Sequence, residues 1–102
     1  MKVEREDNGY KASEKLEKMA KVFEKAVEKV FPGSTIEFFQ IGGNWLITKV
    51  RLENHHYGNF NVCENRVSFN GRWCSMDERK AFEALTYNDE LFNGRLLEIA
   101  ND

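Results

Sequence analysis

The sequence predicts an α+β domain with an N-terminal helix, an antiparallel sheet of three strands or four, and two C-terminal helices, in the order α-β-β-β-α-α. Three observations support this fold class. An apolar stripe with helical spacing runs through 11–31, two segments rich in β-branched and aromatic residues flank 42–44, and a helix-capping motif begins at Ser75. An antiparallel sheet with helices packed on it is the natural arrangement for elements in this order.

Length and composition indicate a single globular unit. The chain has 102 residues, of which 41% are hydrophobic and 31% charged, close to the average of globular domains. Residues 1–10 are mostly charged and polar and contain Asn8-Gly9, so we expect them to form a flexible lead-in. The rest of the chain, 11–102, is predicted to be one α+β domain.

The first helix is predicted over 11–31. Its apolar residues recur at i, i+3, i+4 and i+7, which places them along one side of a helix. They are Leu16, Met19, Ala20, Phe23, Ala26, Val27 and Val30. Ser13 is the expected N-cap, and the pairs Glu14–Lys18 and Glu17–Lys21 have the spacing of helical ion pairs. Pro32-Gly33 ends the helix, because proline cannot continue it.

The strands are predicted in the middle of the chain. Segments 35–41 and 45–53 read as a β-hairpin, since a Gly-Gly-Asn turn separates them. A loop follows at 54–58, and 59–69 is a third strand region. The apolar residues of 59–69 change from even to odd positions, which a bulge or a tight turn near Glu64-Asn65 would explain.

The C-terminal part is predicted to contain two helices. Ser75 and Glu78 have the spacing of a capping box, and the helix that they open carries Phe82 and Leu85. A last amphipathic helix is marked by Leu91, Phe92, Arg95, Leu96 and Ile99. Gly94 lies inside that pattern and would cost the helix about 1 kcal/mol relative to alanine.

Charge and cysteine content restrict the function class. The formal net charge is −2, which gives no support to an extended nucleic-acid surface. The charge is uneven, because 75–102 has three basic and seven acidic side chains. The two cysteines do not suggest a disulfide scaffold, and no secretory signal or membrane-spanning apolar run is present. We therefore expect a cytoplasmic protein with reduced thiols and no membrane partner.

A metal-dependent enzyme centred on His55 and His56 is one alternative. Together with Cys63 and Cys74, these histidines offer the nitrogen and sulfur ligands that zinc prefers. The spacing lacks the C-x2-C or H-x3-H clips of strong zinc motifs, and adjacent histidines in an extended segment point to opposite sides. We therefore predict no catalytic residue, no metal ligand and no cofactor.

A nucleic-acid-binding module is the other alternative. The first helix carries a stripe of lysines, to which Arg51, Arg66 and Arg72 could add. The stripe consists of Lys11, Lys15, Lys18, Lys25 and Lys29. Glutamates run beside these lysines, as they do on a mixed, solvated helix face, so the stripe is a weak signal for phosphate binding.

The hairpin raises the question of what covers the sheet. Its apolar residues cannot all point to one side of the sheet, because side chains alternate along a strand. They are Phe38, Phe39, Ile41, Trp45, Leu46 and Ile47. The second face is covered either by the C-terminal helices or by a partner, which would be another protein or a second copy of the chain.

The function predicted from these observations is a non-enzymatic protein-binding module. A small stand-alone inhibitor or regulator that blocks a larger partner fits a compact domain without catalytic motifs; phage-encoded inhibitors are an analogy of type, not a sequence match. The predicted partner-binding residues combine residue types common in hot spots, namely Trp45, Tyr57, Arg72 and Trp73, with the acidic Asp77, Glu78, Asp89 and Glu90. The acidic residues would face a basic surface of the partner. A homo-oligomer stays open.

Overall fold

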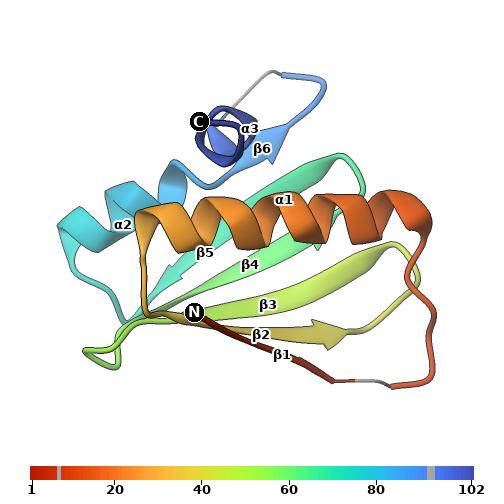
Figure 1. Ribbon diagram of the computed structural model, residues 1–102, viewed down its shortest axis with the longest axis horizontal. Coiled ribbons are helices and arrows are strands. Elements are labelled where there is room, and N and C mark those ends of the chain that lie inside the picture. Colours follow the sequence, from red (N-terminus) through yellow and green to blue (C-terminus); the bar gives the residue numbers. More distant parts are fainter. Residues whose placement is uncertain (7, 92–93) are drawn as a thin grey trace.

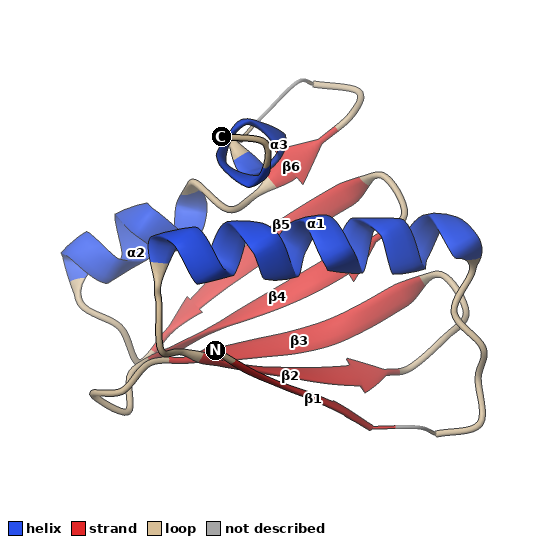
Figure 2. Ribbon diagram, in the orientation of Figure 1, coloured by secondary structure: helices blue, strands red, loops and turns tan. Residues whose placement is uncertain are grey.

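The computed structural model describes residues 1–6, 8–91 and 94–102 (Figure 1). The described elements are β1 (Lys2–Glu6), α1 (Glu14–Val30), β2 (Thr35–Gln40), β3 (Trp45–Arg51), β4 (Tyr57–Cys63), β5 (Arg66–Arg72), α2 (Met76–Glu83), β6 (Tyr87–Asn88) and α3 (Leu96–Ala100). The strands form one six-stranded sheet in the order β1-β2-β3-β4-β5-β6. The helices lie together on one side of this sheet (Figure 2).

The first helix forms as its sequence predicts. The Ser13 side chain caps α1 by accepting a hydrogen bond from the Leu16 backbone N–H at 3.1 Å. Glu14 and Lys18 approach to 3.9 Å, whereas Glu17 pairs with Arg5 of β1 at 2.7 Å rather than with Lys21. The hydrogen bond from Arg5 lowers the pKa of the Glu17 carboxyl below its usual value. The N-terminal strand is therefore tied to the first helix.

The strand pairing is mixed because β1 and β2 run parallel, while every other neighbouring pair runs antiparallel. The predicted hairpin is confirmed as β2 and β3, in which Phe39 lies opposite Ile47. The connection from β1 to β2 passes through α1, as a parallel pair requires a crossover.

The predicted fold class is wrong in the size and order of the sheet. The order is β-α-β-β-β-β-α-β-α, and the sheet is mixed rather than antiparallel with three or four strands. The single strand region at 59–69 is two strands, β4 and β5, which reverse at Glu64-Asn65. The change of phase in the sequence therefore marks a tight turn and not a bulge.

The N-terminal strand was missed because it carries no apolar alternation. All five residues of β1 are exposed, and four of them are charged. An edge strand with charged side chains resists pairing with other chains, but such a strand looks like a solvated tail in the sequence. The strand lies within 1–10, the segment expected to be a lead-in.

The C-terminal helix was predicted too long. It is the five-residue α3, and β6 precedes it. Gly94 lies before α3 with φ +92°, and a Cβ there would stand 1.8 Å from the Thr86 carbonyl oxygen, so only glycine fits. Phe92, which the amphipathic pattern included, lies outside the described residues. The helix predicted at Ser75 is confirmed as α2, with both hydrogen bonds of its capping box.

The core lies between the helices and one face of the sheet. Phe60 of β4 packs edge-on against Phe23 of α1 at 4.9 Å and against Phe82 of α2 at 5.7 Å between ring centroids. The helix α1 also contacts α3, where Lys29 donates a hydrogen bond to the Ala100 carbonyl oxygen at 3.3 Å. All three described helices thus pack on the same side, and the C-terminal helices do not cover the second face.

Candidate functional site

The side of the sheet that faces away from the helices is the candidate functional site. Paired residues lie on the same face, so the register and the burial alternation identify the side chains on this side. From β2 to β5 they are Thr35, Glu37, Phe39, Trp45, Ile47, Lys49, Arg51, Tyr57, Asn59, Asn61, Cys63, Arg66, Ser68, Asn70 and Arg72. We call this surface the open face.

The open face carries a patch of apolar side chains on β2 and β3, which extends to the start of β3. Phe39 of β2 pairs with Ile47 of β3, and Trp45 lies two residues before Ile47 on the same strand. Trp45 is 46% exposed and Ile47 is 41% exposed. A packed sheet face would bury such residues, so these side chains are available to a partner.

A hollow of about 360 Å³ lies beside this apolar patch. Phe39, Ile47 and Lys49 form one part of its lining. The polar part of the lining comes from the next two strands, with Asn59, Asn61, Ser68 and Asn70. The Asn61 Oδ1 atom is buried and accepts no hydrogen bond from the described residues. A carbonyl oxygen in that position favours a ligand or partner that brings a donor.

Cations outnumber carboxylates on the open face from β2 to β5, and one of them, Lys49, lines the hollow. The open face from β2 to β5, all of which the structure describes, carries four cations and one carboxylate. The cations are Lys49, Arg51, Arg66 and Arg72, and the carboxylate is Glu37. Arg51 pairs with Glu37 at 2.5 Å, and Lys49 lies 4.9 Å from the ring centroid of Tyr57. From β2 to β5 this face therefore has an excess of positive charge, although the whole chain has a net charge of −2, while β1 brings Lys2, Glu4 and Glu6 to the same side of the sheet.

Of the predicted aromatic and arginine residues, Trp45, Tyr57 and Arg72 lie on the open face, and Trp73 follows its last residue. Tyr57 and Arg72 are cross-strand neighbours on β4 and β5. Arg51, at the end of β3, pairs with Tyr57. Trp45 is the first residue of β3 and lies about 20 Å from Arg51 at 3.3 Å per residue. Trp73 follows β5 directly, is 71% exposed and has φ +51°. The structure therefore brings Tyr57, Arg72 and Trp73 to one end of the sheet and places Trp45 at the other.

The predicted acidic residues do not join this surface as one group. Asp77 and Glu78 lie in the first turn of α2, and Asp89 and Glu90 follow β6. Asp89 accepts a hydrogen bond from the Tyr87 hydroxyl at 3.0 Å, which raises the pKa of Tyr87. The Asn88 side chain accepts the Glu90 backbone N–H at 3.1 Å. These contacts are local and shape the turn after β6.

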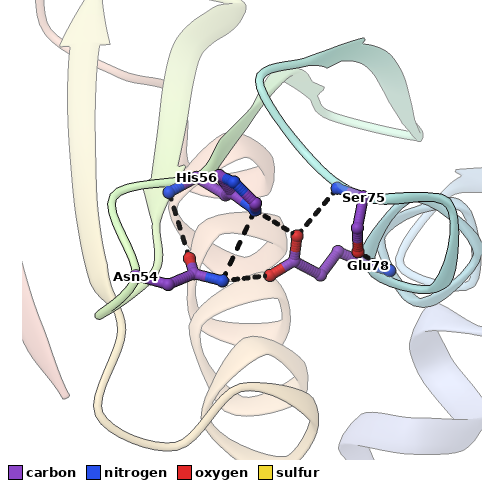
Figure 3. Close-up of polar contacts among 4 residues, drawn as sticks. All are labelled: Asn54, His56, Ser75 and Glu78. Carbon is purple, nitrogen blue, oxygen red and sulfur yellow. Dashed lines mark hydrogen bonds and ion pairs between the residues drawn. The ribbon is translucent and has the colours of Figure 1, made fainter.

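Glu78 is engaged inside the molecule. Its carboxylate accepts hydrogen bonds from the Ser75 backbone N–H at 2.8 Å and from Asn54 Nδ2 at 2.7 Å, and its Oε1 lies 2.6 Å from His56 Nδ1 (Figure 3). We call these four residues the Glu78 network. The Ser75 backbone contact, followed by that of Asn54, lowers the pKa of Glu78 to about 2. The network ties the β3–β4 loop to the start of α2.

The histidines and cysteines are not gathered into a metal centre. Across the described ranges, no three His, Cys, Asp or Glu side chains come together as a possible metal site. Cys63 ends β4, whereas Cys74 lies beyond the end of β5 that pairs with the start of β4. The two cysteines therefore lie toward opposite ends of the β4–β5 pair, and both thiols are free. His55 is exposed with φ +69°, and His56 belongs to the Glu78 network.

The lysine stripe of the first helix is a mixed, solvated surface. Lys18 lies 3.9 Å from Glu14, and Lys21 lies 3.5 Å from Glu24. Lys29 is directed to the C-terminal segment, where it donates to backbone oxygens of Ala100 and Asp102. The open face has a clearer excess of positive charge than this helix.

Several residues of the open face are not among the predicted site residues. Lys49 and the polar residues of the hollow, Asn59, Asn61, Ser68 and Asn70, become one surface only when β4 and β5 are recognised as two strands. The signal is present in the sequence, because every second residue of 57–63 and of 66–72 belongs to this face. Asparagine is common in loops, so the three asparagines do not indicate strands by themselves.

Of the helices in the described residues, none has the length and apolar character that a membrane crossing requires. Comparisons of the chain with models of known protein families, with curated proteins and with solved structures found no match.

Proposed function

We propose that this protein is a non-enzymatic binding module that recognises another protein through the open face of its sheet. The observation that carries the proposal is that none of the described helices lies on this face, which presents Trp45 and Ile47 with nearly half of their surface exposed. A monomeric domain rarely leaves such residues together on a sheet, and exposed apolar patches of this kind mark interaction sites.

The arrangement of the open face supports a protein partner. Protein interfaces commonly have an apolar centre, where a few anchor residues fill pockets, and a polar rim that hydrogen-bonds. Here the apolar patch of Phe39, Trp45 and Ile47 offers the anchors, and the hollow of about 360 Å³ beside it is large enough for a side chain of the partner. The buried Asn61 Oδ1 offers an acceptor inside the hollow.

The charge of the open face supports an acidic partner surface. Arg66 lies opposite Asn88 and Arg72 lies opposite Tyr57, so neither cation has a carboxylate opposite it in the cross-strand register, whereas Glu37 lies opposite Lys49 and pairs with Arg51. We therefore propose that the partner presents Asp or Glu side chains around an apolar anchor. Complementary charge of this type mainly raises the association rate and selects the partner. In this proposal Asp77, Asp89 and Glu90 are secondary contacts with the partner. Glu78 is not a partner contact, because its carboxylate is engaged in the Glu78 network.

Such a module suits a small inhibitor or regulator that blocks a larger partner by covering part of its surface. The cytoplasm is the compartment that we propose, because both cysteines are free, as in a reducing environment.

A single-stranded nucleic acid is the second candidate partner. The specific observation in its favour is that exposed aromatic rings and cations share one sheet face, as in modules that stack bases. The two candidates differ in salt dependence, since phosphate contacts make affinity fall steeply with salt.

The test is affinity capture with three forms of the protein: the wild type, Ile47→Asp and Leu97→Asp. Leu97 of α3 is 36% exposed and lies in the helix layer, so Leu97→Asp adds the same charge at a comparable exposure away from the open face. We expect one protein partner, retained after nuclease treatment, that Ile47→Asp loses and Leu97→Asp keeps. Equal capture by both variants would remove the open face as the binding surface. Loss of the partner after nuclease treatment would favour nucleic acid.

A further inference from the structure

The outer edge of β5 is only partly paired. The neighbouring strand β6 has two residues, and they pair with Arg66 and Val67 at the start of β5. The strand continues for five further residues, Ser68 to Arg72, with no described strand on that side. The sheet therefore ends in an open strand edge.

The direction of the backbone groups along this edge follows from the pairing. Asp89 N–H donates to the Asn65 carbonyl oxygen at 3.2 Å, so the peptide groups of Asn65 face β6. In an antiparallel ladder these groups alternate between the two sides of a strand. Phe69 and Gly71 therefore direct their N–H and C=O groups outward, and no described residue pairs with them through its backbone.

A groove of about 430 Å³ lies along this edge. Phe69, Asn70 and Gly71 form its strand side, while Arg79 and Glu83 of α2 and the connecting Thr86 form the other side. Arg79 and Glu83 pair at 3.4 Å and are both about half exposed. Gly71 leaves space for the Arg79 side chain, whose Nε would lie 3.4 Å from a Cβ at that position. The groove thus combines unpaired backbone groups with a side wall.

We propose that this groove binds a short extended segment of a partner protein, which adds to the sheet as a strand beside β5. Strand addition is the recognition mode that satisfies exposed N–H and C=O groups of an edge strand. The free part of the edge, Ser68 to Arg72, has five residues, or about 17 Å at 3.4 Å per residue. A short segment fits this length, because β6 limits the edge at one end and the chain turns away at Trp73 at the other.

The chemistry of the segment follows from the two faces that its side chains would meet. Side chains on the helix side would pack beside Phe69 and the aliphatic part of Arg79, so apolar residues fit there. Side chains on the other side would join the open face beside Asn70 and Arg72, where an acidic residue fits. The expected segment therefore alternates apolar and acidic residues. This inference concerns the strand edge and does not rest on the proposed use of the open face.

Amide hydrogen exchange of the free protein tests the edge itself. The amides of Phe69 and Gly71 are expected to exchange at least about 10-fold faster than those of Ser68 and Asn70, whose amide groups face β4. Exchange is measured residue by residue by NMR at one pH and temperature. Equal protection of the two pairs of amides would overturn the proposal, because the edge would then already be occupied.

Binding is tested with displayed random peptides of about eight residues, a length that covers the edge. Peptides selected on the wild type are then compared on Gly71→Pro and on Gly71→Ala. Both variants add a Cβ that meets the Phe69 ring, but only proline also removes the N–H. We expect alternating apolar and acidic peptides that bind Gly71→Pro at least about 10-fold more weakly than Gly71→Ala.

Amide hydrogen exchange of the wild type in complex with a selected peptide tests binding in a way that does not depend on how well Gly71→Pro folds. A selected peptide should slow exchange of the Phe69 and Gly71 amides of the wild type at least about 10-fold. The proposal fails if no peptide is enriched, if the selected peptides slow neither amide, or if sedimentation shows that a second copy of the chain protects this edge instead. Ile47→Asp should leave peptide binding unchanged, which separates this site from the open face.

Discussion

The two faces of the sheet come from the same strands but have opposite roles. On the helix side, Leu46, Val50 and Val62 have no exposed surface and pack into a continuous core. On the open face, the residues next to them in the chain are Trp45, Ile47, Arg51 and Asn61, which are exposed or half-buried. Since each of the strands β2 to β5 contributes side chains to both faces, the residues that stabilise the core and those available for recognition alternate along one strand. Substitutions of adjacent residues can therefore test the division.

The largest effect is expected from a substitution in the aromatic core. Phe60 is 2% exposed and contacts the rings of Phe23, Phe69 and Phe82. Phe60→Ala should reduce the free energy of unfolding by about 3–5 kcal/mol, because it leaves a cavity. Asn61→Ala, at the next residue on the open face, should change it by less than about 1 kcal/mol. Urea denaturation measures both, and similar losses in the two variants would contradict the division.

A smaller loss of stability is expected from added volume on the helix side. At Gly58 an added Cβ would stand 2.8 Å from the Phe69 ring and 3.1 Å from the Phe82 ring. Gly58→Ala should cost about 1–3 kcal/mol of folding free energy through overpacking. In the control Gly43→Ala, the nearest atom to the new Cβ is the Lys11 carbonyl oxygen at 3.5 Å, an ordinary contact, so little change is expected. The melting temperatures of the two variants give the comparison, and equal values would argue against a tightly packed helix side.

The Glu78 network predicts a pH dependence. Its carboxyl has a pKa of about 2 in the folded protein, against an ordinary value of 4.5. A lowered pKa stabilises the fold at pH values above the unfolded-state pKa, and the contribution is lost as the pH falls from 4.5 toward 2. Glu78→Gln should therefore cost about 1–2 kcal/mol at neutral pH, typical of a lost helix cap, and almost nothing near pH 2.

Urea denaturation of both proteins as a function of pH measures this difference. The matched control is Asp77→Asn, which removes the neighbouring carboxylate in the same helical turn. A constant difference between wild type and Glu78→Gln over the whole pH range would show that the carboxylate charge is not what stabilises the network.

The smallest effect on stability is expected on the open face. Trp45 is 46% exposed, so Trp45→Ala should change the free energy of unfolding by no more than about 0.5–1 kcal/mol. The same substitution should weaken binding of the captured partner by about 2 kcal/mol or more, the range of hot-spot residues. Calorimetric titration and urea denaturation measure the two quantities on one protein sample. Unchanged affinity would remove Trp45 from the interface.

Elements with a strong local signal were predictable. The first helix could be located because its apolar stripe and the Ser13 cap are properties of neighbouring residues. The same holds for the capping box of Ser75 and Glu78, and for the hairpin of β2 and β3. In each case the residues that determine the element lie within a few positions of it.

Elements that depend on a distant neighbour were not predictable. The strand β1 consists of exposed residues and exists because β2 offers it a backbone to pair with. The strand β6 has two residues, which is too short for a periodic pattern. For the candidate site, Trp45, Tyr57 and Arg72 were chosen by residue type, whereas the hollow between them needed the register of β3, β4 and β5.

By itself, the sequence determined the mixture of helix and sheet, the ends of α1 and the start of α2, because caps and apolar periodicity act over a few residues. It also indicated that the hairpin had apolar residues on both faces. Only the tertiary structure decided how many strands join the sheet, and that all three described helices pack on the same side. These outcomes depend on backbone pairing and burial between residues far apart in the chain, and such long-range contacts leave no local pattern in the sequence.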